Sequence, residues 1–207
     1  QWIRHRTANV NEYSARYSIL DKEFYIPAKD QLSAQSTSNR QGRGDLITGE
    51  QADEVLKILK DDATRTYDNY EKMLNERFDG STIDERKSGL ARELARMNLT
   101  LNSYTQWYWK TDLLNLLNFL FLRADSHAQY EIRVYAEAML DTVKKWVPIT
   151  HAAFLDYRVG AVHVSAKGKK VIQQMVKGEK INYENSGLSK REWNELMTSF
   201  SFDDKIV

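Results

Sequence analysis

Residues 113–146 read LLNLLNFLFLRADSHAQYEIRVYAEAMLDTVKKW and carry a heavy apolar load in their first half. Asp112 directly precedes this stretch and Pro148 follows it. Aspartate is a favoured residue at the start of a helix, and proline cannot continue one. The stretch therefore predicts one long helix from Leu113 to Trp146, buried on most sides in its first half.

Two further helices are indicated upstream. From Glu50 to about Phe78 the apolar positions recur at helical spacing among many charges, which predicts a long amphipathic helix. Residues 79–81 break this pattern, and a second helical pattern continues to Met97, with Ser81 or Thr82 as its N-cap. The two helices could pair across the turn.

Extended segments account for most of the remaining chain. Residues 1–27 mix β-branched and aromatic side chains and predict a short strand and loop, and residues 98–111 alternate like a strand. Residues 35–49 contain three glycines and predict a surface excursion. A capping box from Ser189 to Glu192 starts a final helix, whereas residues 161–184 stay unassigned. The prediction is a helix-rich α+β fold with a small mixed or antiparallel sheet.

Length and composition bound the class of protein. We expect the 207 residues to form one domain, with residues 161–207 as a C-terminal extension. Thirty basic and twenty-nine acidic residues leave a net charge of +1, so an anion site must be local. The chain contains no cysteine and no apolar run long enough to span a bilayer, which favours a cytoplasmic protein. Because it begins at Gln1, we expect further residues upstream.

The first candidate site is the triplet Arg4-His5-Arg6, which is followed by Glu12, Ser14 and Arg16. Guanidinium groups bond phosphate in a bidentate way and keep their charge. In an extended segment the two arginines of the triplet would share one side and the histidine would face the other. The alternative is a solvated strand edge, which is the commoner explanation of an isolated triplet of this kind.

The second candidate site lies on the predicted long helix. Arg123 and His127 are four residues apart and would share a face with Glu131. An arginine just after an apolar run needs a partner, and by spacing alone an ion pair with Glu131 or Asp125 is the commoner explanation. Asn118 would project away from this face, so one ligand contacting both would need groups from different subunits.

Other patterns add little. Arg96 closes the stretch LARELARM, where a cation at a helix C-terminus is the simple explanation. The four histidines share no spacing typical of metal ligands, and no glycine-rich phosphate loop is present. We therefore predict no metal site and no Rossmann or P-loop nucleotide site.

Taken together, the ordered stretches resemble flavin-dependent thymidylate synthases. That family is marked by RHR followed, after seven intervening residues, by a serine, here RHRTANVNEYS ending at Ser14. The resemblance continues through NEYSARY, DKEFYIP, LARELARMNLTLNSYTQWYWKTD and NFLFLRADSHAQYEI, and spans residues 1 to about 146. It implies a ThyX-like fold, a homotetramer with active sites between subunits, and reductive methylation of dUMP to dTMP. FAD would be the cofactor, and methylenetetrahydrofolate and NADPH the co-substrates.

The resemblance also implies roles for individual residues. Arg123 would stabilise negative charge on the uracil ring, and Ser14 would contact dUMP without acting as a nucleophile. The positions that match FAD contacts are Arg4, His5, Arg6, Glu12, Asp112, Asn118 and His127. The positions that match dUMP contacts are Gln1, Arg4, Glu12, Ser14, Arg16, Arg96 and Arg123.

Two other functions fit parts of the sequence. An RNA-binding module could use Arg4, Arg6, Arg16 and the loop at residues 40–44, with Trp107 and Tyr108 stacking on bases, although the near-zero net charge weighs against it. A chain that folds without activity, because it lacks upstream residues of the pocket, is the other possibility.

Overall fold

The computed structural model describes residues 1–37 and 42–201, and the chain divides into two compact units, Gln1–Thr142 and Val143–Val207. Each unit contains its own cluster of buried apolar side chains. None of the helices in these described ranges is long and apolar enough to cross a membrane.

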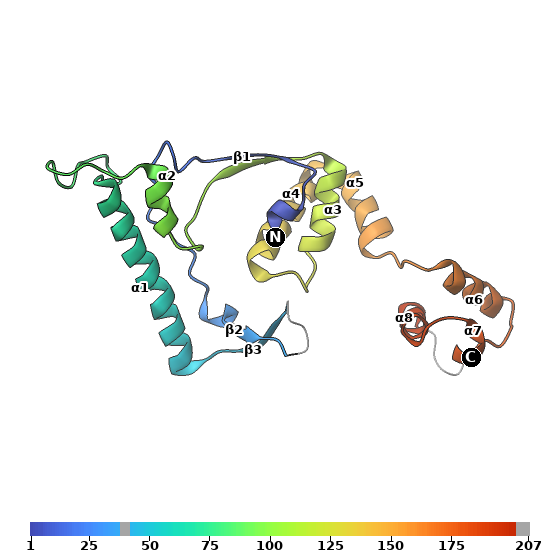
Figure 1. Cartoon of the computed structure of the whole chain (residues 1–207). Coiled ribbons are helices and arrows are strands. Elements are labelled where there is room, and N and C mark those ends of the chain that lie inside the picture. The colour runs from blue at the N-terminus through green and yellow to red at the C-terminus, as the bar shows by residue number, and fades with distance from the viewer. Residues whose placement is uncertain (38–41, 202–207) are drawn as a thin grey trace. The chain divides into compact units, whose positions relative to one another are not determined.

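The first unit contains the predicted amphipathic helix as α1, Gly49–Leu74 (Figure 1). It ends four residues before the expected Phe78, because Asn75 adopts a left-handed conformation with φ 55°. The Asn75 side chain then donates to the carbonyls of Asp84 and Lys87 at 2.7 Å each, and accepts from the Asp84 amide at 2.8 Å. A single asparagine thus both stops α1 and organises the loop that follows.

The predicted helix from residues 81 to 97 is wrong over most of its length. Only α2, Arg92–Ala95, and the 3-10 turn η3, Arg96–Asn98, are helical. The preceding loop uses its backbone groups to bond Asn75, and Gly89 packs so closely that a Cβ there would lie 1.9 Å from the Leu74 carbonyl oxygen. These contacts compete with a helix, which the apolar spacing could not indicate.

The core between α1 and α2 is built around two tyrosines. Tyr67 and Tyr70 are fully buried, with their rings 5.6 Å apart at 61°, an edge-to-face arrangement. The Tyr67 hydroxyl donates to the Leu20 carbonyl at 2.6 Å, so its polar end is satisfied. Ile19, Leu74 and Ala95 complete the cluster. This cluster ties the segment before residue 27 to the two helices.

The strands form two small antiparallel pairs. β1, Asn9–Glu12, pairs with β4, Trp107–Lys110, so that Asn9 lies opposite Lys110 and Glu12 opposite Trp107. β2, Ser33–Gln35, pairs with β3, Arg43–Leu46; β3 lies within the predicted surface excursion and is fully exposed, whereas β2 begins before it. Short 3-10 turns precede each pair: η1, Trp2–Arg4, and η2, Lys29–Gln31. The helix-rich α+β prediction with a small sheet is confirmed.

The long helix predicted from Leu113 to Trp146 is wrong in one respect, because it is two helices. α3 spans Leu113–Arg123 and α4 spans Tyr130–Trp146. Asp112 caps α3 as predicted, accepting from the Asn115 amide at 2.9 Å. Between the helices the Asp125 carboxylate accepts from the His127 amide at 2.8 Å, a local turn that competes with the helix. In Figure 1 the β1–β4 pair connects the region of α1 and α2 with α3 and α4.

The second unit is a small helical bundle. Pro148 follows the preceding helix, as predicted, and is also the first residue of α5, Pro148–Phe154. α5 continues directly into the π-helical turn η4, Leu155–Val159. α6, Ala166–Val176, and α7, Tyr183–Ser186, fill the region left unassigned. The Ser189 capping box with Glu192 is confirmed at the start of α8, Lys190–Phe200. A buried apolar cluster of this unit consists of Val171, Ile181, Leu188 and Leu196.

Replacing Gly89 with alanine tests the loop against α1. The new methyl group would meet the Leu74 carbonyl oxygen at 1.9 Å, so the loop must move and the free energy of unfolding should fall by about 1–3 kcal/mol. Urea unfolding measures the change, with the exposed neighbour Ser88→Ala as the control. Equal midpoints for the two variants would show that the loop does not pack as described.

Candidate functional site

The amino-terminal triplet lies directly after η1. The His5 amide donates to the Trp2 carbonyl at 3.0 Å, which folds the chain into a tight turn there. His5 is half-buried, whereas Arg4 and Arg6 are exposed. Within the described ranges neither arginine forms an ion pair, so both guanidinium groups are directed to solvent or to a ligand.

Arg123 and His5 meet within one chain. The Arg123 Nε donates to the His5 Nε2 at 3.0 Å, across 118 residues of sequence. The His5 ring stands edge-on to Phe119, with centroids 4.8 Å apart at 71°. Burial and the neighbouring Arg123 cation both lower the pKa of His5, so the neutral ring accepts this hydrogen bond. The resemblance implied active sites between subunits, whereas this contact lies within a single chain.

The expectation that Arg123, His127 and Glu131 share a helical face is wrong. Arg123 ends α3, His127 lies in the turn between the helices, and Glu131 lies in α4. The His127 side chain is 94% exposed and its Nδ1 lies 2.9 Å from the Asp125 carboxylate. The alternative ion pair of Arg123 with Glu131 or Asp125 is not formed, because those carboxylates bind other groups.

Glu131 joins α4 to the β2–β3 hairpin instead. Both its carboxylate oxygens accept from Arg43 Nη2 at 2.6 Å, and the Tyr25 hydroxyl donates to it at 2.9 Å. Burial alone would raise the pKa of Glu131, but the bonds from Arg43 and others outweigh it and hold that pKa at about 2. Burial and the bond to Glu131 raise the pKa of Tyr25 to about 12.

This network was not anticipated from the sequence, and it bears on the RNA-binding alternative. Arg43 belongs to the loop at residues 40–44 that the alternative used, and its guanidinium is committed to Glu131. Residues 40 and 41 lie outside the described residues. The partners in this network are separated by 88 and 106 residues, so no local spacing could have revealed them.

Glu12, Ser14 and Arg96 line one hollow of about 450 Å³. Glu12 ends β1, and Arg96 begins η3 after the short α2. The Ser14 hydroxyl accepts from the Arg16 amide at 3.3 Å, while the Arg16 guanidinium lies 5.4 Å from the centre of the Tyr17 ring and is exposed. The structure therefore brings together three of the residues expected to contact dUMP, with Arg16 beside them in sequence.

Asp112 and Asn118 occupy different positions on α3. The Asp112 carboxylate accepts from the amide and the side chain of Asn115, and these bonds lower its pKa. Its oxygens therefore already support the helix start. Asn118 is exposed in the middle of α3.

An aromatic groove of about 790 Å³ was also not anticipated. Gln1 and Trp2 line it together with two strand residues, Trp107 and Trp109, and with Tyr135 of α4. The Gln1 side chain donates to the side chain of Gln129, the residue just before α4, at 2.6 Å. The groove has a sequence signal, the alternating aromatic run at residues 107–109, which the sequence analysis interpreted as a strand and, in the RNA-binding alternative, as a surface that stacks on bases.

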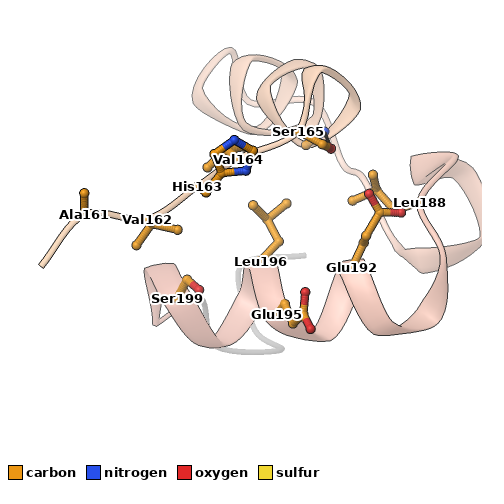
Figure 2. Close-up of a pocket in the computed structure, with 11 residues that line it drawn as sticks. Ala161, Val162, His163, Val164, Ser165, Leu188, Glu192, Glu195, Leu196 and Ser199 are labelled. Atoms are coloured by element: carbon orange, nitrogen blue, oxygen red, sulfur yellow. Dashed lines mark hydrogen bonds between the residues drawn. The ribbon is translucent and has the colours of Figure 1, made fainter. Parts of the chain in front are cut away.

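The second unit contains a hollow of about 460 Å³ between its helices (Figure 2). Three of its polar side chains already serve the fold: Ser165 caps α6, Glu192 belongs to the capping box of α8, and Glu195 pairs with Arg191 at 2.7 Å. We therefore place the candidate site in the first unit, at the His5–Arg123 contact.

Comparison with known proteins connects this geometry to a family. The sequence model of the family described as "Thymidylate synthase complementing protein" matches residues 1–149. The flavin-dependent thymidylate synthase of Gluconobacter oxydans (strain 621H) is 61% identical over 196 residues, which is 95% of this chain and 62% of that protein. The flavin-dependent thymidylate synthase of Rickettsia bellii (strain RML369-C) is 58% identical over 197 residues, 95% of this chain and 67% of that protein.

Solved structures agree with the sequence matches. The UMP/dUMP methylase PolB from Streptomyces cacaoi, bound with 5-Br dUMP, aligns with a TM-score of 0.61 at 29% identity, over 75% of this chain and 64% of that one. The chain thus spans less than two thirds of the Gluconobacter protein and of this methylase. The matched residues 1–149 contain the His5–Arg123 contact and the hollow at Glu12, Ser14 and Arg96, and this chain belongs to the thymidylate synthase complementing protein family.

Proposed function

We propose that the protein carrying this chain reductively methylates dUMP to dTMP in the cytoplasm, with FAD as cofactor, methylenetetrahydrofolate as carbon donor and NADPH as reductant. The observation that carries the proposal is the bond between Arg123 and His5, which joins the amino-terminal triplet to the end of α3. The names of the curated relatives and the dUMP analogue bound to PolB support the same substrate.

We assign dUMP binding to the hollow lined by Glu12, Ser14 and Arg96. Arg96 is exposed there, and an arginine suits a phosphate because it donates two parallel hydrogen bonds and stays charged. The Ser14 hydroxyl and the Glu12 carboxylate add a donor and an acceptor for sugar or base. Gln1, Arg4 and Arg16 belong to the proposed set without lining this hollow, and Gln1 lines the aromatic groove.

Arg123 has the arrangement required to stabilise negative charge on the uracil ring. Its Nε is occupied by His5, which leaves the terminal nitrogens of a half-buried, fixed cation for a ligand. A preorganised cation beside developing negative charge is an effective form of electrostatic catalysis. The 207 residues contain no cysteine, so a thiolate attack on the ring would have no nucleophile among them.

The residues proposed to hold FAD fit an anionic dinucleotide. Arg4 and Arg6 are exposed cations that flank His5 in the sequence, and guanidinium groups suit a pyrophosphate. Glu12, Asp112, Asn118 and His127 are exposed and able to bond further groups of the cofactor. Bound FAD supplies the redox chemistry, while these side chains bind and orient it.

A homotetramer is consistent with the outer face of α3. Leu114 and Leu122 are 69% and 53% exposed, and Asn118 lies between them at four-residue steps on the same face. Exposed apolar side chains that line up on a helix are typical of an interface. We propose that a second copy covers this face, and that residues 161–207 are an extension of one synthase domain.

Replacing Arg123 with alanine should abolish dTMP formation. Removing one preorganised charge from such a site lowers kcat by about 100- to 1000-fold. The yield of dTMP from dUMP is measured with the natural protein that contains this chain. The control is Arg65→Ala, which removes an arginine from the exposed surface of α1. A normal yield from the Arg123 variant would refute the role assigned to it.

Replacing Arg96 with alanine should act on binding. Loss of a charged hydrogen bond to the phosphate should raise the KM for dUMP by about 10- to 100-fold with a smaller effect on kcat. Arg86→Ala is the matched control, because its side chain is 89% exposed and outside the hollow. An unchanged KM would remove Arg96 from the dUMP site.

The His5–Arg123 bond should make folding stability depend on pH. The pKa of His5 is lowered below 6.5 in the folded chain, so the unfolded chain takes up the proton first as the pH falls. Stability from this contact is therefore complete above pH 6.5 and decreases as the pH falls through and below that value. Thermal unfolding between about pH 5 and about pH 7.5 should show a flatter profile for His5→Gln. Identical profiles would contradict the lowered pKa.

A further inference from the structure

Tyr25 is bonded to a wall of the hollow assigned to dUMP. Its amide donates to the Asn102 carbonyl at 2.8 Å, and the Asn102 side chain donates back to the Tyr25 carbonyl at 3.0 Å. In the same pairing the Tyr104 amide donates to the Glu23 carbonyl at 3.1 Å. Because residues 103–105 line the hollow, the segment that carries Tyr25 is part of the support of this wall.

The same tyrosine holds the start of α4 through Glu131. The Tyr25 hydroxyl donates to the Glu131 carboxylate at 2.9 Å, and Arg43 Nη2 donates to both of its oxygens at 2.6 Å. Arg43 Nη1 also donates to the Gln31 carbonyl at 3.3 Å, which fixes the guanidinium from the other side. The side chain of Glu131 is 25% exposed, so these charged hydrogen bonds are partly shielded from water and are stronger than they would be on the surface.

The first turn of α4 in turn holds residues 124–129, the α3–α4 turn. Arg133 Nη1 donates to the Ser126 carbonyl at 2.7 Å, and the Asp125 carboxylate accepts from the His127 amide at 2.8 Å. This turn carries His127, which we assign to FAD, and it directly follows Arg123 at the end of α3. A displacement at the start of α4 would therefore move the residues that we assign to FAD and to the uracil ring.

We propose that Glu131 is a positioning residue, which holds the α3–α4 turn in register with the dUMP hollow through its bonds to Tyr25 and Arg43. The inference rests on the proposed function, in which FAD and dUMP have to lie in a reactive alignment. A misplacement of about 1 Å between reacting groups can lower the rate by about 100-fold. The network limits such a misplacement, although its three residues belong to neither set of proposed ligand contacts.

Glu131→Leu tests this role, and Glu76→Leu is the matched control. The Glu76 carboxylate accepts from Arg92 at 2.7 Å and its side chain is 32% exposed, so each variant removes a partly buried carboxylate that is bonded to an arginine. Glu76 belongs neither to the lining of the dUMP hollow nor to the α3–α4 turn.

The first measurement is kcat per bound flavin, in the natural protein that contains this chain. It should fall by about 10- to 100-fold in Glu131→Leu and stay within about 2-fold of wild type in Glu76→Leu. The KM for dUMP should change by less than about 3-fold in both variants, because the substrate contacts remain. Glu131→Gln keeps an acceptor for Tyr25 and Arg43 and should recover most of kcat. A purely structural role would lower the melting temperature and leave kcat per bound flavin unchanged.

Hydrogen exchange provides a second measurement that does not depend on turnover. The amides of residues 99–105 and 124–133 should exchange faster in Glu131→Leu than in wild type, because both segments lose their connection, and Glu76→Leu should leave them unchanged.

Equal kcat per bound flavin in the two leucine variants would overturn the inference, and so would unchanged exchange of residues 124–133 in Glu131→Leu. A loss of dUMP or flavin affinity with normal kcat would also overturn it, because Glu131 would then act on binding. Failure of the proposed function has a different signature: wild type would form no dTMP, while the difference in exchange between the variants would persist.

Discussion

The hydrogen bond from Arg123 to His5 is the contact on which the candidate site depends. A half-buried guanidinium is costly unless it is partnered, and here the partner arrives from the amino-terminal segment, 118 residues away. Trp2 and His5 both pack on Phe119, so the same α3 turn that presents the arginine also seats the segment carrying the triplet. The position of Arg4 and Arg6 follows from this docking.

A histidine as the partner of Arg123 leaves the positive charge of the guanidinium intact, which a carboxylate would not. An acidic side chain would neutralise the guanidinium and weaken its effect on a substrate. The neutral His5 ring satisfies one donor and leaves the positive charge intact, and its lowered pKa keeps it neutral. Glu131, the carboxylate once expected beside Arg123, is held by Arg43 instead. The arrangement separates the structural ion pair from the cation proposed to act on the substrate.

Local signals predicted the parts of the fold that local interactions create. Asp112 and Ser189 cap the helices they were expected to cap, because a cap needs only the adjacent amides. The breaks were missed because their causes lie in side chains that bond the backbone: Asp125 between α3 and α4, and Asn75 after α1. Gly89 adds a close approach that no periodicity reports.

The candidate site was predictable by resemblance more than by spacing. Spacing alone favoured a solvated triplet and an ion pair for Arg123, whereas the ordered motifs pointed to a joint site, and the structure joins His5 and Arg123. The Tyr25–Glu131–Arg43 network was not predicted, although Tyr25 and Glu131 lie in motifs quoted for the resemblance, because its members are far apart in sequence and no spacing connects them.

The geometry of α3 finally bears on how subunits would share active sites. Arg123 and Asn118 are five residues apart, which places them about 140° from each other around the helix. Arg123 turns to His5 of its own chain, whereas Asn118 lies on the exposed face between Leu114 and Leu122. If a second copy covers that face, one α3 helix would contribute residues to two active sites. Arg123 would belong to one active site and Asn118 to the other. Such sharing would make assembly a condition for activity, since no single chain would hold every group of one site.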